Sequence, residues 1–239
     1  MNRIVLMVMK NIFKVPGLWT KLCYNAKHTD EIPEQEKYDL IRHILTLAVD
    51  SGNIDLQVYG EENIPKENGF MIYANHQGLF DCVSLVKSCP APLAAVCKKE
   101  LAGIPFVQQV IDCTKSFLMD RDDARQSLSV IQNVTKEVMA GRNYVIFPEG
   151  TRSRSGNEIQ EFHGGSFRAA IKAKCPVIPV AVVDTHKVFD TKGSAQVSAQ
   201  LHYLPAIHPE EYAGLKANEL AEMVRSRIEE VVKANSGTL

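Results

Sequence analysis

Two short polar segments, each following an apolar run, contain the residues best suited to chemistry. The first, YANHQGLFD at residues 73–81, places a histidine five positions before an aspartate; the second, VIFPEGTRSRSG at residues 145–156, combines a glutamate, glycines, hydroxyl side chains and arginines. A carboxylate that bonds one imidazole nitrogen leaves the other free to accept a proton and stabilises the imidazolium that forms. The first segment therefore predicts a general base, and the second an anion-binding turn.

The spacing of His76 and Asp81 restricts the backbone that could bring them together. In a continuous helix, positions five apart point about 140° away from one another. A turn over residues 75–78 followed by a helix from Leu79 lets the carboxylate reach the imidazole, and Gly78 suits such a turn. The alternative is a simple helix cap, formed by Asp81 or Asn75, with His76 as an ordinary polar surface residue.

The second segment has the composition of a phosphate site. The fork of donors on Arg152 matches phosphate oxygens, Thr151 adds a hydroxyl, and Gly150 lets the backbone approach a ligand closely. Glu149 could orient the arginine or bond a hydroxyl of the substrate. The alternative is an ion pair of Glu149 with Arg152 across the turn, without a ligand.

The elements that must position these segments alternate between strands and helices. Helical periodicity predicts helices over residues 34–50, 122–140 and 209–234, and Gly141 supplies a stop for the second of these. We therefore expect an α/β fold with a mixed, mostly parallel sheet flanked by helices, in which ligands bind beyond the carboxyl ends of strands. The predicted strands are IDLQVYG, FMIYA, LAAVC, SFLMD, YVIF, VIPVAVV and VSAQLHYL.

The first 27 residues combine apolar bulk with five basic side chains, Arg3, Lys10, Lys14, Lys21 and Lys27, and contain no acidic residue. This composition is typical of an amphipathic helical segment on an anionic membrane surface, with a break expected at residues 15–17. The alternative is a helix packed on the domain, with lysines as its solvated face. We predict a membrane-associating segment over residues 1–52 and a catalytic domain over residues 53–239.

Composition excludes several other classes of protein. The net charge of -1 gives no general attraction to nucleic acid, and no apolar run reaches the roughly 18 residues of a membrane span. The six cysteines show no CxxC pair, which predicts reduced thiols and no metal site. The N-terminus lacks the cleavage site of a secretory signal.

The two segments together resemble the glycerolipid acyltransferases of the 1-acylglycerol-3-phosphate acyltransferase type. The match lies in NHQGLFD at residues 75–81 and FPEGTRS at residues 147–153, with weaker blocks FLMDR and VIPVAV at residues 117–121 and 177–182, and it spans roughly residues 55–185. The resemblance implies the fold of that family, with His76 as base and Asp81 as its partner. It assigns substrate binding to Asn75, Arg121, Glu149, Gly150, Thr151 and Arg152.

The resemblance also implies a reaction. The expected acceptor is lysophosphatidic acid, whose free sn-2 hydroxyl takes an acyl group from a thioester of coenzyme A or acyl carrier protein, giving phosphatidic acid without metal or cofactor. The implied location is the cytoplasmic face of the cell membrane. Two alternatives stay open: another acceptor, such as glycerol 3-phosphate or a lyso-aminolipid, and a lipid-binding protein without turnover.

One block departs from the family pattern. Many relatives carry Phe-Lys-x-Gly after the second motif, whereas this chain has FHGG at residues 162–165. A fixed positive charge is thereby replaced by the titratable side chain of His163, which bears on how the polar substrate is held at different pH.

Overall fold

A seven-stranded sheet forms the centre of the protein in the computed structural model, which describes residues 2–191 and 193–237. The strand order is β1-β7-β6-β2-β5-β3-β4, and all neighbours are parallel except β6 and β7. Each strand coincides with a predicted run, so the expected mixed, mostly parallel sheet is confirmed. The strands are β1 (Ile54–Tyr59), β2 (Met71–Ala74), β3 (Leu93–Lys98), β4 (Phe117–Met119), β5 (Asn143–Ile146), β6 (Val177–Val183) and β7 (Val197–Tyr203).

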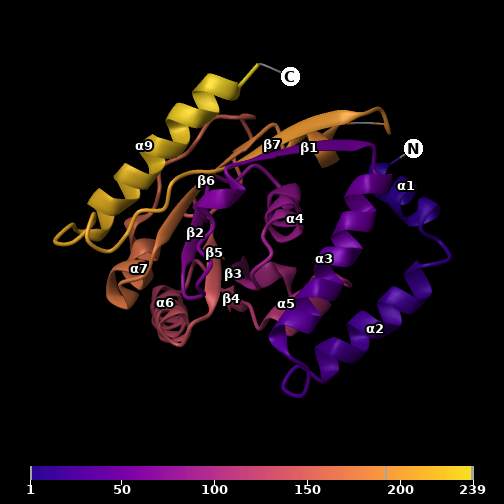
Figure 1. Ribbon diagram of the computed structural model, residues 1–239, viewed down its shortest axis with the longest axis horizontal. Coiled ribbons are helices and arrows are strands. Elements are labelled where there is room, and N and C mark those ends of the chain that lie inside the picture. The colour runs from indigo at the N-terminus through magenta and orange to yellow at the C-terminus, as the bar shows by residue number, and fades with distance from the viewer. Residues whose placement is uncertain (1, 192, 238–239) are drawn as a thin grey trace.

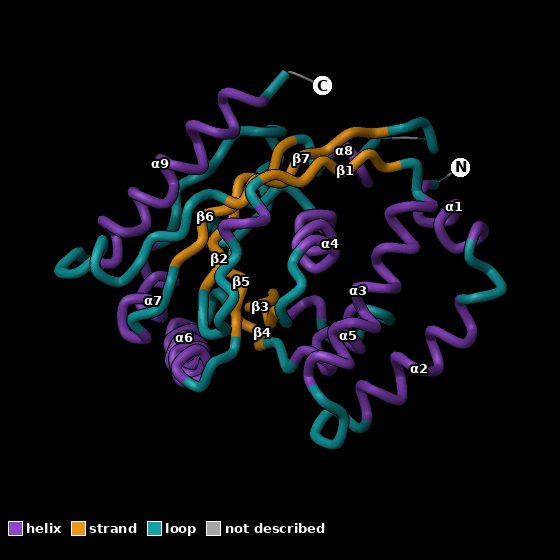
Figure 2. Tube along the Cα trace, viewed as in Figure 1, coloured by secondary structure: helices purple, strands orange, loops and turns teal. Residues whose placement is uncertain are grey.

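Helices cover both faces of this sheet (Figure 1). One face packs against α6, α7 and α9, and the other against α4, with α3 and α5 beside it and α1 and α2 outermost; Figure 2 shows the same layers by element type. The helices are α1 (Arg3–Lys10), α2 (Val15–Lys27), α3 (Glu34–Ser51), α4 (Leu79–Ser88), α5 (Val107–Thr114), α6 (Ala124–Met139), α7 (Arg168–Ala173), α8 (Lys187–Asp190) and α9 (Ala217–Asn235).

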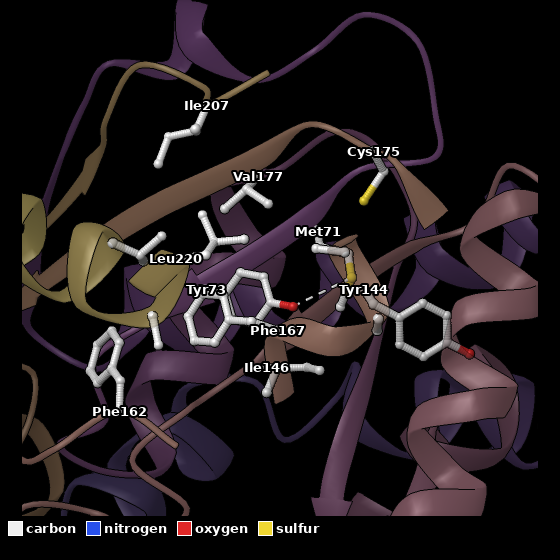
Figure 3. Packing of buried hydrophobic residues seen from close by; sticks show 14 of the residues in the cluster. Met71, Tyr73, Tyr144, Ile146, Phe162, Phe167, Cys175, Val177, Ile207 and Leu220 are labelled. Carbon is white, nitrogen blue, oxygen red and sulfur yellow. Dashed lines mark hydrogen bonds between the residues drawn. The ribbon is translucent and has the colours of Figure 1, made fainter. Parts of the chain in front are cut away.

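The larger core cluster lies between the central strands and the α6, α7 and α9 layer (Figure 3). Within it, the rings of Tyr73 and Phe167 stack with centroids 4.0 Å apart, and both side chains are fully buried. The Tyr73 hydroxyl donates to the carbonyl of Ser166 at 3.0 Å. Truncation of such a buried aromatic side chain costs about 3–5 kcal/mol. This packing fixes β2, the strand that leads directly into His76.

The predicted helices are observed with one change of boundary. Those over residues 34–50 and 122–140 match α3 and α6, and Gly141 follows α6 with a φ of +90°, as a helix stop requires. The C-terminal helix begins at Ala217, so the prediction that it starts near residue 209 was wrong. The reason is that Tyr212 enters the core from a turn, where its hydroxyl donates to the carbonyls of Ala170 and Cys175.

The N-terminal segment forms two helices, as predicted, but they separate earlier than expected. The break lies at residues 11–14, and Pro16 sits in the first turn of α2, where its missing N–H removes no helical hydrogen bond. Arg3 was counted among the lipid-facing cations, yet it is 2% exposed and bonds the carbonyls of Gly52, Asn53, Val188 and Ala195. Its guanidinium instead fastens α1 to the rest of the protein.

The two expected units pack closely together. Leu22 of α2, residues 40, 41 and 45 of α3 and Cys113 of α5 share one buried apolar cluster. A functional division at residue 52 stays a prediction, and its outer limits, residues 1 and 239, lie outside the described chain. Across the described ranges, none of the helices has the length and apolar character needed to cross a bilayer.

Candidate active site

The two polar segments meet at the carboxyl ends of β2 and β5, which are neighbours in the sheet. His76 is the point of contact. Its backbone N–H donates to Glu149 Oε1 at 2.7 Å, and its carbonyl accepts from the backbone N–H of Ser153, also at 2.7 Å. The turn after one strand is thereby bonded to the turn after the other. Segments seventy residues apart in sequence form a single site.

His76 and Asp81 form the expected pair. Helix α4 begins at Leu79, which places Asp81 on its first turn, and Asp81 Oδ2 lies 2.7 Å from His76 Nδ1. The same oxygen accepts from the backbone N–H groups of Gln77 and Gly78 at 2.6 and 2.9 Å. Asp81 therefore caps the helix and binds the imidazole at once: the alternative was right about the cap, whereas His76 is not an ordinary surface residue.

This arrangement sets the proton positions on the imidazole. An ionised carboxylate only accepts hydrogen bonds, so Nδ1 of His76 carries its proton and Nε2 presents a lone pair. Asp81 is fully buried, whereas the His76 side chain is 20% exposed. The His76 ring stacks on Phe147 with centroids 4.2 Å apart. The imidazole is thus held on one face and at one nitrogen, and its other nitrogen can take a proton from a ligand.

A cavity of about 530 Å³ lies next to this pair. Phe147 and Glu149 form part of its wall and also contact His76. Its lining includes apolar side chains, among them Val96, Met119, Leu128 and Ile131, and polar or cationic ones, namely Arg121, Thr151, His163, Ser166 and Arg168. Such a cavity suits a ligand with an anionic group and an apolar portion.

The cations of this cavity are available to a ligand. Arg121 and Arg168 make no ion pair with any described residue. Partial desolvation lowers the pKa of Arg121, which still remains a cation. Arg168 was not predicted as a site residue. The sequence gives little indication of such a role, because Arg168 lies on α7, beyond both motifs. The departure from the family pattern, His163, lines the cavity as well.

Three comparisons with known proteins bear on this geometry. Residues 55–183 match the model of the Acyltransferase family. The chain belongs to the acyltransferase family. It is 34% identical over 166 residues to the 1-acyl-sn-glycerol-3-phosphate acyltransferase of Escherichia coli (strain K12), with 69% of this chain and 67% of that protein covered. To the protein of the same name from Borreliella burgdorferi it is 27% identical over 191 residues, or 79% and 76% of the two chains.

A solved structure has the same fold. The crystal structure of the 1-acyl-sn-glycerophosphate (LPA) acyltransferase PlsC from Thermotoga maritima superimposes with a TM-score of 0.78 at 20% identity. The superposition covers 98% of this acyltransferase and 97% of the other chain. The predicted fold of the glycerolipid acyltransferases is therefore confirmed, including the N-terminal helices.

The remaining predicted site residues of the acyltransferase fall in different surroundings. Glu149 is buried, its two oxygens accept from the backbone N–H groups of His76 and Gln160, and burial raises the pKa of its carboxyl. Gly150 has a φ of +70°, and a Cβ there would meet His163 Cδ2 at 3.2 Å. Arg152 is exposed, forms no ion pair with described residues and does not line the cavity. The alternative of an ion pair between Glu149 and Arg152 is not observed.

Asn75 is buried and bonded to the neighbouring strand. It is 1% exposed, its Nδ2 donates to the carbonyl of Val182 at 3.0 Å, and its Oδ1 accepts from the N–H of Val182 at 2.8 Å. Its amide therefore joins the ends of β2 and β6 and holds the backbone before His76, and its role in substrate binding stays a prediction.

The end of β6 contributes residues that were not predicted. Thr185 and His186 follow this strand and reach Asp81 and Gln77. The signal was present in the sequence, because DTH at residues 184–186 follows an apolar run just as NHQ and PEG do. In the described part of the chain, no group of three or more His, Cys, Asp or Glu side chains could hold a metal ion, and all six cysteines are free.

Proposed function

We propose that this acyltransferase transfers a fatty acyl group from an acyl thioester to the free sn-2 hydroxyl of 1-acyl-sn-glycerol 3-phosphate. The observation that carries the proposal is the contact of His76 with Asp81 beside a cavity that presents arginine and histidine side chains. The names of the relatives, which are 1-acyl-sn-glycerol-3-phosphate acyltransferases, agree with an acceptor that has one phosphate and one free hydroxyl.

In the proposed mechanism, Nε2 of His76 accepts the proton of the acceptor hydroxyl. The hydroxyl oxygen attacks the thioester carbonyl carbon, the carbon–sulfur bond breaks, and the proton passes to the departing thiolate. The products are an ester and a free thiol, so acyl coenzyme A and acyl carrier protein are both suitable donors. Asp81 keeps Nδ1 protonated and stabilises the imidazolium, a role worth about 10² to 10⁴ in rate for the base. The step uses no metal or cofactor.

The phosphate of the acceptor is proposed to bind in the cationic part of the cavity. Arg121 and Arg168 supply fork-shaped donors there, and Thr151 and Ser166 add hydroxyl groups. Arg152, which is exposed and free of ion pairs with the described residues, can approach from the segment that follows Gly150 and Thr151. Anchoring the phosphate places the sn-2 hydroxyl at a fixed distance from His76, and positioning of this kind supplies several kcal/mol of the barrier.

The N-terminal helices are proposed to rest on an anionic membrane surface. The turn between them carries Phe13, which is 98% exposed between Lys10 and Lys14. This arrangement is the one expected for interfacial binding, in which apolar groups enter the bilayer and lysines meet lipid phosphates. The segment would hold the acyltransferase at the cytoplasmic face of the membrane that contains its lipid substrate.

An apolar groove lies between this segment and α4, the helix that begins three residues after His76. It has a volume of about 430 Å³, and its lining includes Ile4, Leu18 and Trp19 of the N-terminal helices and Leu79 and Val83 of α4. Leu79 is three residues beyond His76 and is 50% exposed. We assign the groove to a fatty acyl chain, since its lining is apolar and includes residues of the helix that carries Asp81.

The test is acyl transfer to a panel of acceptors. Purified protein is supplied with an acyl thioester and with 1-acyl-glycerol 3-phosphate, glycerol 3-phosphate or a lyso-aminolipid, and both free thiol and lipid product are measured. Phosphatidic acid formed from the first acceptor, with turnover reduced at least about 10² by His76→Ala, supports the proposal. Preference for another acceptor would show that the proposed substrate is wrong. Thiol release that is unchanged in His76→Ala would show that His76 is not the base.

A further inference from the structure

A buried hydroxyl group contacts the carboxylate that holds the His76 ring. Thr185, in the turn between β6 and α8, is 1% exposed, and its Oγ1 lies 2.5 Å from Asp81 Oδ1. The two residues are 104 positions apart in sequence. Because the carboxylate is fully buried and can only accept, Thr185 is the donor in this bond.

The two oxygens of Asp81 are supported very unequally. Oδ2 accepts from three donors, namely Nδ1 of His76 and the backbone N–H groups of Gln77 and Gly78. Oδ1 accepts from Thr185 alone among the residues described. Rotation about the bond to a carboxylate is soft, so donors on one oxygen leave its plane loosely defined. The Thr185 hydroxyl defines that plane.

We propose that Thr185 is a positioning residue for acyl transfer, whose hydroxyl fixes the Asp81 carboxylate and, through it, the His76 imidazole. The inference rests on the proposed function of the site. It assigns no contact with substrate to Thr185. A bond to a buried, charged oxygen is among the stronger hydrogen bonds in proteins, and a carboxylate oxygen left without a donor in such a place is costly.

The turn that carries Thr185 is held in place independently of Asp81. Asp184 has a φ of +61°, in the left-handed region, and its backbone N–H donates to Asn157 Oδ1 at 2.9 Å. Its carboxylate accepts from Asn157 Nδ2 and pairs with Lys187 Nζ at 2.8 Å. These contacts offset the cost of the backbone conformation. The Thr185 hydroxyl is therefore presented to Asp81 by a preformed turn.

Gln77 closes the network on the other side. Its Nε2 donates to Asn157 Oδ1 and to the carbonyl of Val182, which fixes the orientation of the amide. Its Oε1 then faces Thr185 Oγ1 at 2.9 Å and His186 Nδ1 at 3.2 Å. A threonine hydroxyl has one proton, and the shorter, charge-assisted bond to Asp81 takes it. His186 supplies a donor to Gln77.

Other titratable groups surround the network. Glu149 bonds the backbone of His76, the Asp184 carboxylate pairs with Lys187, and Cys82 lies beside Asp81 on α4, where burial strongly raises the pKa of its thiol. None of these side chains takes the place of Thr185 at Asp81 Oδ1 within the described structure. Removal of the hydroxyl is therefore not compensated by a neighbour.

The experiment compares Thr185→Val, which keeps the shape and removes the hydroxyl, with Thr185→Ser, which keeps the hydroxyl. The matched control is Thr135→Val, since Thr135 is buried on α6 and, among the residues described, its hydroxyl bonds only the carbonyl of Ile131 in its own helix. For Thr185→Val we expect kcat to fall about 10- to 100-fold with little change in either KM, because one hydrogen bond to a charged group is lost. Thr185→Ser and Thr135→Val should keep most of the turnover.

A pH–rate profile separates positioning from mere stability. Without the Thr185 donor, the charge of Asp81 is concentrated toward the imidazole and favours the imidazolium, so the acid limb of the Thr185→Val profile moves to higher pH. Equal turnover and an unchanged profile in Thr185→Val would overturn the proposal. So would equal losses in Thr185→Ser and Thr185→Val that follow their melting temperatures.

Two further measurements cover the remaining outcomes. If Thr185→Val does not fold, Thr185→Cys replaces it, since a thiol is a weak donor of similar size; turnover equal to that of Thr185→Ser would then overturn the proposal. If the wild-type protein transfers no acyl group to any acceptor, the proposed function fails. In that case the proton NMR signal of His76 Nδ1–H reports directly on the hydrogen bond between His76 and Asp81. A signal that is identical in wild type and Thr185→Val would overturn the positioning role.

Discussion

Replacing Asp81 by asparagine tests the electrostatic part of the mechanism with little change of shape. The asparagine oxygen can take the place of Oδ2 and accept from Gln77 and Gly78, while its NH₂ group faces Thr185, whose hydroxyl can also accept. The helix cap and the geometry of His76 are preserved. What is lost is the negative charge beside the imidazole.

The magnitude follows from the distance between the two groups. His76 Nδ1 and Asp81 Oδ2 are 2.7 Å apart, which puts the centres of charge of the two groups about 4 Å apart. At an effective dielectric constant of about 20, the attraction between imidazolium and carboxylate is about 4 kcal/mol. Loss of that stabilisation in the transition state lowers kcat about 10³-fold.

The assay is thiol release from an acyl thioester with saturating 1-acyl-glycerol 3-phosphate, measured from pH 5 to pH 9 together with thermal unfolding. Asp190→Asn is the matched control, because it removes an exposed carboxylate on α8. We expect full turnover for this control and a nearly unchanged melting temperature for both variants. If folded Asp81→Asn protein keeps more than about a tenth of wild-type kcat, charge stabilisation by Asp81 is not how the site works.

Three other outcomes are expected. Phe13→Glu should reduce co-sedimentation of the protein with phosphatidylglycerol vesicles. Met139→Glu, which changes an exposed side chain of α6, should not. Equal binding by the two variants would argue against the N-terminal anchor. Arg168→Ala should raise the KM for the acceptor several-fold at unchanged kcat, and Lys172→Ala on the same helix is the control. An unaltered KM in Arg168→Ala would mean that Arg168 does not bind the phosphate. Burial lowers the pKa of His202 in the folded protein below its ordinary 6.5. As the pH falls below about 6.5, His202 therefore takes up a proton more readily in the unfolded chain than in the folded one. The folded protein loses stability until the pH has passed the lower folded pKa. The melting-temperature difference between wild type and His202→Gln should therefore shrink from pH 7.5 to pH 5.5, and a constant difference would contradict this.

The sequence was sufficient to predict those features that depend on local pattern. Each strand is a short apolar run, and the pairing of His76 with Asp81 follows from a turn and a helix start only five residues apart. The convergence of residues 76 and 149 was also foreseeable, since both follow strands of a parallel sheet whose carboxyl ends share an edge.

The features that escaped prediction depend on contacts across long stretches of chain. Nothing local marks Thr185 as the partner of Asp81, because the pairing requires β6 to lie beside β2 in the sheet. Arg3 looks like any cation of an amphipathic helix until four carbonyls are found around it. Asn75 belongs to the motif by position, yet its amide is used by the backbone of the neighbouring strand.

The short segment after β6 joins the proposed membrane helix to the catalytic pair. At one end Thr185 donates to Asp81, and three residues later the carbonyl of Val188 accepts from Arg3 Nε at 2.8 Å. The bonds of Arg3 to the carbonyls of Gly52 and Ala195 hold α1 against the C-terminal end of α3 and against the loop before β7. The helix proposed to lie on the bilayer is thereby held in a fixed position relative to His76 by a few hydrogen bonds. Under the proposed function the acceptor enters from that bilayer, and the depth of the site relative to the lipid head groups then depends on Arg3 as well as on the apolar residues of α1.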